Sequence, residues 1–141
     1  MRFNEVLYVL LILVLLFIFV TSGTMKLTEK FHEETHELLT NMFEKQFTPV
    51  WQRVVGDKIG IQIDSNLFQT IIGGLELASG VLLVTPIYFV GGVVLGAIMI
   101  GAILTHVWAG EPAGFQALLL VACMASVLLR PSDQARKSKS K

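Results

Sequence analysis

Three ionisable residues interrupt the apolar parts of this sequence. Lys26 and His106 stand near the ends of apolar runs, and Glu76 stands inside one. A charged side chain in a low-dielectric environment is costly, so it normally faces other protein groups and finds a partner. Ser22, Gln69 and Gln116 add hydroxyl and amide groups to the same runs. These residue types could form an ion pair, a proton site or a pocket that binds a ligand or partner.

Catalytic and metal-binding chemistry find little support in the sequence. A hydrolase needs a nucleophile beside a base, and nothing around Ser22 or His106 is typical of a nucleophile turn. His32 and His36 form a short H-E-E-T-H match to a zinc-binding pattern, without an obvious third ligand downstream. The one cysteine, Cys123, has no partner for a disulfide. We expect no catalytic residue, metal or cofactor, and hence a protein that is not an enzyme.

Composition indicates lipid as the solvent for this chain. Its 141 residues are 53% hydrophobic and 16% charged, against roughly 25% charged in soluble domains. The mean hydropathy is +0.66. A soluble fold of this size could not bury so much apolar surface. The formal net charge of zero gives no reason to expect nucleic acid as a partner.

Four segments are long and apolar enough, or nearly so, to cross a membrane, which takes roughly 20 residues. They span about 6–25, 67–84, 87–108 and 115–129. The sequence therefore predicts an all-α membrane protein, a four-transmembrane-helix bundle formed as one domain by residues 1–130. The first segment also resembles a signal peptide, with Arg2 before it and Ser22–Gly23 near its end.

The loop between the first two segments carries a helical apolar stripe over about residues 29–55. Its other face is acidic and basic, which predicts an amphipathic helix that Pro49 ends or kinks. Such a helix could rest on the membrane surface or on the bundle, or it could bind a partner.

Basic residues predict the orientation. Arg2 and the 131–141 tail, with Arg130 just before it, hold six lysines and arginines, and the first loop holds four. Positive charge favours the cytoplasmic side, so we expect both termini in the cytoplasm and the first loop in the lumen or exterior.

This orientation gathers the polar residues in the lumenal half. Lys26 and His106 share one level, and Glu76 lies about nine residues deeper, roughly 13 Å at the helical rise. A direct Lys26–Glu76 pair is then stretched, with Ser22 as a bridge. The resulting polar pocket, with Gln69 and Gln116, has two interpretations: a site for a ligand, proton or partner, or a structural network that sets helix register.

Small residues predict where helices pack. Gly92 and Gly96 form a G-x-x-x-G pair in the third segment, and Gly74 and Ala78 form a similar pair in the second. Such pairs favour packing within the bundle, and they also permit a homodimer.

Three local motifs together resemble one known family. They are Gly23-Thr24-Met25-Lys26-Leu27-Thr28, Gly73-Gly74-Leu75-Glu76-Leu77-Ala78-Ser79-Gly80, and His106 followed by Gly110-Glu111-Pro112. In this order they are similar to the NACHO family (transmembrane protein 35 family), membrane chaperones of nicotinic acetylcholine receptors within the DoxX-like superfamily. The resemblance implies an endoplasmic-reticulum protein that binds pentameric ligand-gated ion channel subunits and assists their folding, assembly and surface expression.

The tail offers a separate indication of location. Lys137 and Lys139 stand at the fifth and third positions from the C-terminus, as in a K-x-K-x-x retrieval signal. The alternative is a basic flank that contacts anionic lipid.

Two other functions stay open. One is a DoxX-like membrane oxidoreductase subunit or quinone-binding protein that uses the polar pocket. The other is a small carrier built around Glu76, which four helices without an evident inverted repeat make less favourable.

Overall fold

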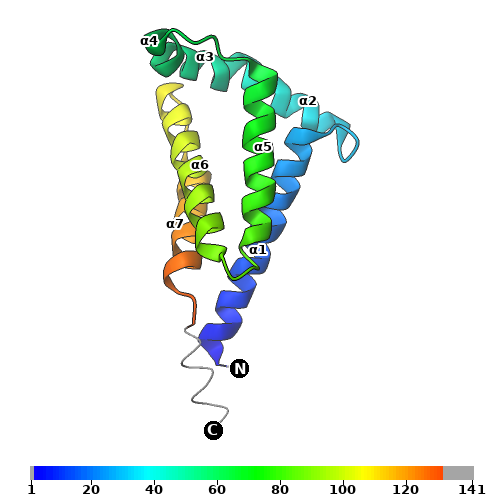
Figure 1. The fold of residues 1–141 in the computed structure, drawn as a ribbon, viewed down its shortest axis with the longest axis vertical. Coiled ribbons are helices and arrows are strands. Elements are labelled where there is room, and N and C mark those ends of the chain that lie inside the picture. The colour runs from blue at the N-terminus through cyan, green and yellow to red at the C-terminus, as the bar shows by residue number, and fades with distance from the viewer. Residues whose placement is uncertain (1, 132–141) are drawn as a thin grey trace.

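Two pairs of long helices make up most of the computed structural model, which describes residues 2–131. The first pair is α1 (Phe3–Leu27) with α5 (Ser65–Leu82), and the second is α6 (Tyr88–Trp108) with α7 (Gly114–Leu128). Successive long helices run in opposite directions, so α1 begins and α7 ends at the same end of the molecule (Figure 1). These four helices occupy the predicted segments, with ends shifted by a few residues. The described residues form helices and loops, without strands.

Local sequence explains where the long helices start and stop. Asp64 caps α5, because its Oδ1 accepts bonds from the backbone N–H of Asn66 and Leu67. α6 ends just before Gly110, which has φ +75° and takes the left-handed conformation that glycine adopts without steric cost. Pro112, two residues later, cannot extend the helix.

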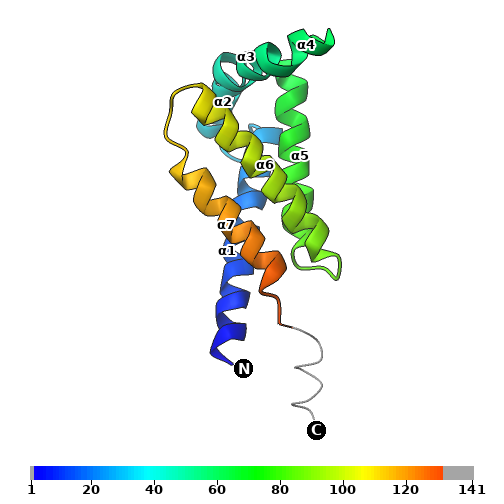
Figure 2. The same ribbon diagram turned by 90° about the vertical axis from the view of Figure 1, so that its left-hand side faces the viewer.

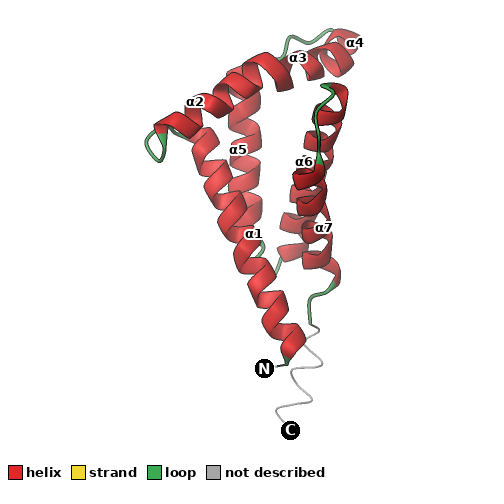
Figure 3. Ribbon diagram, turned by 180° about the vertical axis from the view of Figure 1, so that it is seen from behind, coloured by secondary structure: helices red, strands yellow, loops and turns green. Residues whose placement is uncertain are grey.

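A shorter helical run crosses the far end of both pairs, where they are furthest apart (Figures 1 and 3). We call this run, residues 33–59, the lid. It consists of α2 (Glu33–Met42), the π-helical turn η1 (Phe43–Phe47), α3 (Thr48–Trp51), the π-helical turn η2 (Gln52–Gly56) and α4 (Asp57–Ile59). The end of the molecule under the lid is here called the wide end. Figure 2, turned by 90°, shows the lid over α5 and α6 together.

The backbone stays helical through Pro49, where the sequence predicts an end or a kink. Pro49 stands in the first turn of α3, and a π-helical turn adjoins α3 on each side. A proline has no N–H to donate, and a π-helical turn accommodates the changed bonding by a local widening of the helix. The predicted segment 29–55 therefore becomes several short helices in continuous sequence.

Two helices, α1 and α6, are long and apolar enough by themselves to cross a membrane. α7 is apolar but has only 15 residues. α5 has 18 residues, and its polar side chains, Asn66, Gln69 and Glu76 among them, lower its hydropathy. Length and composition thus single out two of the four predicted spans.

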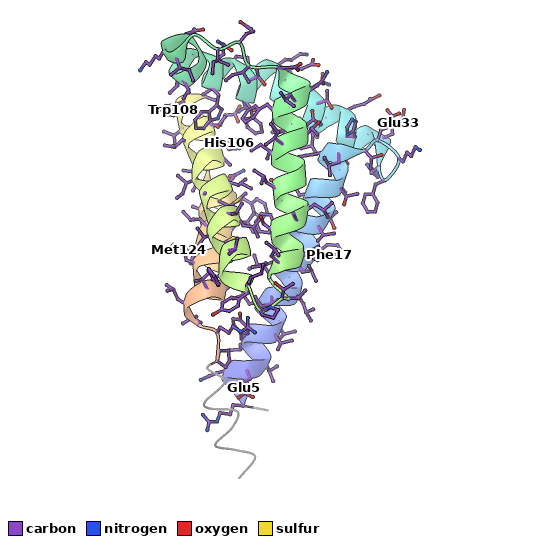
Figure 4. All side chains as sticks on the ribbon, in the orientation of Figure 1. Glu5, Phe17, Glu33, His106, Trp108 and Met124 are labelled. Carbon is purple, nitrogen blue, oxygen red and sulfur yellow. The ribbon has the colours of Figure 1, made fainter. Side chains whose placement is uncertain are left out.

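Polar side chains are buried and large apolar ones are exposed, which reverses the usual order of a soluble domain. Lys26, Gln69, Glu76 and His106 are all less than a tenth exposed. Phe17 and Met124 are 72% and 53% exposed and point away from the helices (Figure 4). Exposed leucine, isoleucine, valine and phenylalanine side chains occur on α1, α5, α6 and α7 alike. An apolar solvent around the long helices accounts for this distribution.

The apolar core lies where α1 meets the second helix pair. Leu15 and Phe19 of α1, Leu95 of α6 and Cys123 of α7 are each at most 1% exposed and belong to one cluster. Below it, the Tyr8 hydroxyl donates to the Ser126 carbonyl at 3.0 Å. These contacts hold α1 against α7 at the end of the molecule opposite the lid, here called the narrow end.

Glycines allow the closest helix contacts, though not all of the predicted ones do. A Cβ on Gly23 would lie 2.7 Å from the Gly73 carbonyl oxygen, so α1 and α5 touch through their backbones. The prediction of packing at Gly74 and Ala78 is wrong within this chain. A Cβ on Gly74 would meet nothing within 4 Å, and Ala78 is exposed. The packed face runs through Gly73 and Glu76, one residue of rotation away.

Gly92 and Gly96 lie against α7. A Cβ on Gly92 would clash with Val127, and one on Gly96 would lie 3.7 Å from Leu120. This predicted pair therefore packs within the bundle, as small residues in membrane helices commonly do.

We expect Gly23→Ala to destabilise the protein by about 1–3 kcal/mol, because the added methyl group has no room beside the α5 backbone. The measurement is thermal unfolding in detergent, followed with a thiol-reactive dye that reports exposure of Cys123, the single cysteine. The matched control, Gly74→Ala, should be neutral or more stable by about 0.5–1 kcal/mol. Equal unfolding midpoints for the two variants would contradict the contact.

Candidate functional site

A buried ion pair joins α1 to α5. Lys26 Nζ lies 2.8 Å from Glu76 Oε2, and the two residues are 9% and 3% exposed. The Ser22 hydroxyl donates to the same carboxylate oxygen at 2.9 Å and accepts from Lys26 Nζ at 2.7 Å. The three side chains therefore form a closed triangle of charge-assisted hydrogen bonds, which are stronger than bonds between neutral groups.

Lys26 and Glu76 pair directly, whereas the sequence predicts a stretched pair with Glu76 about nine residues deeper. The reason is that α5 extends toward the wide end beyond the level of Lys26. The Cβ of Lys26 lies beside Gly73, eight residues after α5 begins at Ser65. Glu76 is therefore only about one turn deeper than Lys26. Ser22 and Lys26 are four residues apart and so share a face of α1.

Gln69 supports this triangle from the α5 side without joining it. Its Nε2 donates to the Lys26 carbonyl oxygen and to Thr40 Oγ1 of α2, each at 3.1 Å. The His36 ring Nδ1 lies 2.7 Å from the Met25 carbonyl, which requires Nδ1 to carry the proton and donate. The bonds to the Lys26 and Met25 carbonyls satisfy groups at the end of α1 that have no helical partner. His36 ties α1 to the lid directly, and Gln69 does so through Thr40.

His106 belongs to a second polar group, on the other helix pair. Its Nδ1 lies 3.1 Å from Glu111 Oε2, and its Nε2 lies 3.1 Å from Gln116 Nε2. An imidazole that donates from Nδ1 and accepts at Nε2 satisfies both contacts. Gln46 of the lid donates to the same Glu111 oxygen at 2.6 Å. Hydrogen bonds from Gln46 and His106 lower the pKa of the Glu111 carboxyl below its usual value.

A cavity of about 530 Å³ separates the two polar groups. Ser22, Lys26 and Glu76 line it from the first helix pair, and His106 and Gln116 line it from the second. The lid contributes five aromatic and apolar side chains to the lining, namely Leu39, Met42, Phe43, Phe47 and Trp51. Apolar residues such as Ile18, Met99 and Leu119 line the remainder. The volume lies within the roughly 300–1,000 Å³ of small-molecule sites.

Aromatic contacts attach the lid to the helices around the cavity. The Phe43 ring packs edge-on against Phe68 of α5, with centroids 5.3 Å apart, and Phe47 packs against His106 at 5.9 Å. Trp51 Nε1 donates to Thr105 Oγ1 of α6 at 2.8 Å. Figure 4 shows His106 and Trp108 beneath the lid at the wide end.

The structure thus divides the predicted cluster in two. Ser22, Lys26 and Glu76 bond directly to one another, and Gln69 adjoins them. His106 and Gln116 bond to each other on the opposite side of the cavity. Sequence reasoning missed Glu111, Gln46, Thr105 and Trp51 as partners. Glu111 could have been found as the carboxylate one loop after His106, whereas the others depend on the course of the lid. The tail residues Lys137 and Lys139 lie outside the described residues.

The other candidate residues are occupied in structural contacts. His32 caps α2, because its Nδ1 accepts from the Thr35 backbone N–H at 3.2 Å. Ser22 bonds to Glu76 and Lys26, and no bond links it to His106 within residues 2–131. Across those residues, His, Cys, Asp and Glu side chains form no group of three that could hold a metal ion.

Helices that expose apolar side chains and bury an ion pair are typical of a membrane protein. The sequence profile described as the DoxX-like family matches residues 9–129, most of the chain. The chain belongs to the DoxX-like family. No curated protein matches the sequence.

Removal of one partner of the buried pair should destabilise the protein strongly. We expect Lys26→Met and Glu76→Gln each to lower the unfolding free energy by about 3–5 kcal/mol, because each leaves an unpaired polar or charged group buried. The double variant removes both charges, so its loss should be smaller than the sum of the single losses by about 0.5–3 kcal/mol. Thermal unfolding in detergent, read through Cys123, measures all three. Additive losses would show that the two side chains do not interact.

Proposed function

We propose that this chain crosses the membrane four times, with α1, α5, α6 and α7 as the spans. α5 is about 27 Å long at the helical rise, close to the roughly 30 Å of a hydrocarbon core. Its polar side chains Gln69 and Glu76 are buried against α1, and it presents Ile71, Leu75 and Val81 outward. α7 packs on α6 along its length and exposes Leu118, Val121 and Leu128. Burial of Gln69 and Glu76 removes the main objection to α5 as a span, since the exposed Asn66 lies in its first turn at the wide end.

In this arrangement the lid lies on the lumenal side of the endoplasmic reticulum and both termini are cytoplasmic. The basic residues around α7's end and the tail support this orientation, as does the smaller number of lysines and arginines in the first loop. The tail lysines at 137 and 139 support retrieval to the endoplasmic reticulum. The lid then rests at the lumenal face with its apolar side chains over the cavity.

Glycosylation mapping tests the topology, since oligosaccharide is added to N-x-S/T only in the lumen. The chain has no such motif, and Gly60→Asn with Gln62→Thr would create one at an exposed turn. Asparagine tolerates the left-handed backbone at position 60, where φ is +73°. We expect this variant to gain one glycan, seen as an endoglycosidase-sensitive mass shift. The same motif in a peptide before Met1 should stay unmodified, and the reverse result would invert the orientation.

We further propose that the protein is a chaperone that binds pentameric receptor subunits, of the nicotinic acetylcholine receptor class, within the membrane. The observation that carries this proposal is spatial. The three motifs that resemble the NACHO family, far apart in sequence, meet around one cavity. Gly23 touches Gly73, Lys26 bonds Glu76, and His106 of the third motif lines the same cavity as Lys26 and Glu76. Residues that match a family in three places and converge in space support a shared working part.

A binding role without turnover agrees with the chemistry of these residues. The polar groups around the cavity bond mainly to one another, and the Ser22 hydroxyl is bonded to Glu76 and Lys26 rather than to an imidazole. The outward apolar side chains of α1 and α7, among them Phe17 and Val121, give client helices a surface of the same polarity as lipid. In lipid, association then depends on close packing and on exposed small residues. Gly74 and Ala78 on α5 offer such a site for a client or for a second copy of this chain.

Co-expression with nicotinic receptor subunits tests this role. We expect surface binding of a labelled nicotinic antagonist to rise several-fold when the chain is present, and the chain to co-purify with receptor subunits. Gly74→Leu should reduce this rescue, because it blocks the open small-residue face without a contact inside the bundle. Gly96→Ala, on the internal face, is the control and should leave rescue intact if its unfolding midpoint is unchanged. No increase with any of several subunits would reject the receptor role.

A second candidate, a DoxX-like membrane oxidoreductase subunit or quinone-binding protein, is favoured by the cavity alone. Its volume and aromatic lining suit a quinone ring, and the Lys26 ammonium could donate to a quinone carbonyl. Cys123 is the single thiol of the chain, so dithiol chemistry would need a second protein. Quinone recovered with the purified protein would support this candidate.

A further inference from the structure

The buried triangle of Ser22, Lys26 and Glu76 has unused hydrogen-bonding capacity. An ammonium group has three N–H donors, and two of them serve Ser22 and Glu76. A carboxylate has two oxygens, and the bonds from Ser22 and Lys26 both reach Oε2. Within the described part of the chain, Glu76 Oε1 receives no hydrogen bond. Because Lys26 and Glu76 both line the cavity, a spare donor and a spare acceptor lie side by side at its polar end.

The charge of the cavity selects for a neutral occupant. Lys26 and Glu76 compensate each other at 2.8 Å, and the other polar groups in the lining are hydroxyl, amide and imidazole groups. A charged ligand would enter a low-dielectric space without a counter-charge, which is expensive. A neutral molecule avoids this cost.

The apolar end of the cavity exists because α6 presents small residues to it. Ala97, Gly101 and Ala102 line the cavity where larger side chains would close it. A Cβ on Gly101 would lie 3.7 Å from Trp51, so the lid reaches over this stripe. Ala97 and Phe115 are exposed as well as lining, which places an opening at the outer surface of α6 and α7. In the proposed topology that surface adjoins lipid, the natural source of an apolar ligand.

We propose that this cavity binds a neutral lipid alcohol with an apolar body of sterol size. A hydroxyl group donates and accepts at once, so it can donate to Glu76 Oε1 and accept from Lys26 Nζ. A ketone or quinone carbonyl only accepts and would leave Glu76 Oε1 unpaired. The body then lies among Phe19, Met99 and Leu119, toward the narrow end. The inference uses the membrane placement proposed above and is independent of the receptor role.

Energy transfer to a fluorescent sterol, dehydroergosterol, tests the proposal in receptor-free nanodiscs. Trp108→Phe leaves Trp51, which lines the cavity, as the single tryptophan donor. In this background we expect saturable transfer from Trp51 to dehydroergosterol. Ala102→Phe fills the cavity and should weaken the interaction at least about tenfold. Val81→Phe adds the same side chain at an exposed position of α5 that does not line the cavity, and it should leave the interaction unchanged.

Competition on the protein without cavity substitutions tests the head group. Cholesterol should displace dehydroergosterol, and its 3-methyl ether and 3-ketone should be about tenfold weaker, because neither can donate to Glu76. Equal energy transfer in the Ala102→Phe and Val81→Phe variants would show that the sterol does not bind in this cavity. If the methyl ether competed as well as cholesterol, or if decylubiquinone competed better, the proposal that the ligand is an alcohol would be wrong. Since receptor subunits are absent, neither result depends on the chaperone role, and glycosylation mapping tests the membrane placement separately.

Discussion

The contact of α1 with α5 at the level of Lys26 and Glu76 is the constraint on which the rest of the structure depends. Two charges can be buried here because they meet at 2.8 Å and share the Ser22 hydroxyl. They can meet because Gly23 and Gly73 let the two backbones touch one turn away. Without the glycines the helices would separate and each charge would face an apolar solvent alone. Without the charges the glycine contact would have no preferred depth. Packing and electrostatics therefore set one register together.

This register explains the asymmetry between the two ends of the molecule. At the narrow end, Leu15 and Phe19 pack against α6 and α7 in a continuous apolar core. At the wide end α5 extends about eight residues beyond the level of Lys26, and α1 stops. The chain then crosses over both helix pairs as the lid, which Gln69 and His36 join to the end of α1. The cavity lies below the lid, where the pairs are no longer in contact and α6 carries small residues.

Much of this arrangement follows from local sequence, and the remainder depends on depth. Hydropathy locates four helices, and the rarity of charge within apolar segments is enough to single out Lys26, Glu76 and His106. Counting residues from the start of α5 placed Glu76 too far below Lys26, because α5 begins about two turns beyond the level of Lys26. The choice of Gly74 over Gly73 has a related cause. The two glycines are adjacent in sequence, and only the rotation of α5 set by Glu76 decides which one faces α1. The bonds of His106 to Glu111 and Gln116 depend in the same way on the loop after Gly110.

A structural role and a binding role for the polar residues are compatible, because different atoms serve them. Glu76 Oε2 accepts from Ser22 and Lys26 and so holds α1 to α5, whereas Glu76 Oε1 and the third Lys26 proton form no hydrogen bond with the described residues. His106 differs, since both of its ring nitrogens are bonded to Glu111 and Gln116. Its contribution is to hold the loop after α6 and, through Phe47, the lid. A ligand that enters the cavity would therefore meet an available partner on the α1–α5 wall and a saturated one on the α6–α7 wall. Because the lid contacts both walls, occupancy on one side would stabilise the lid over the whole wide end.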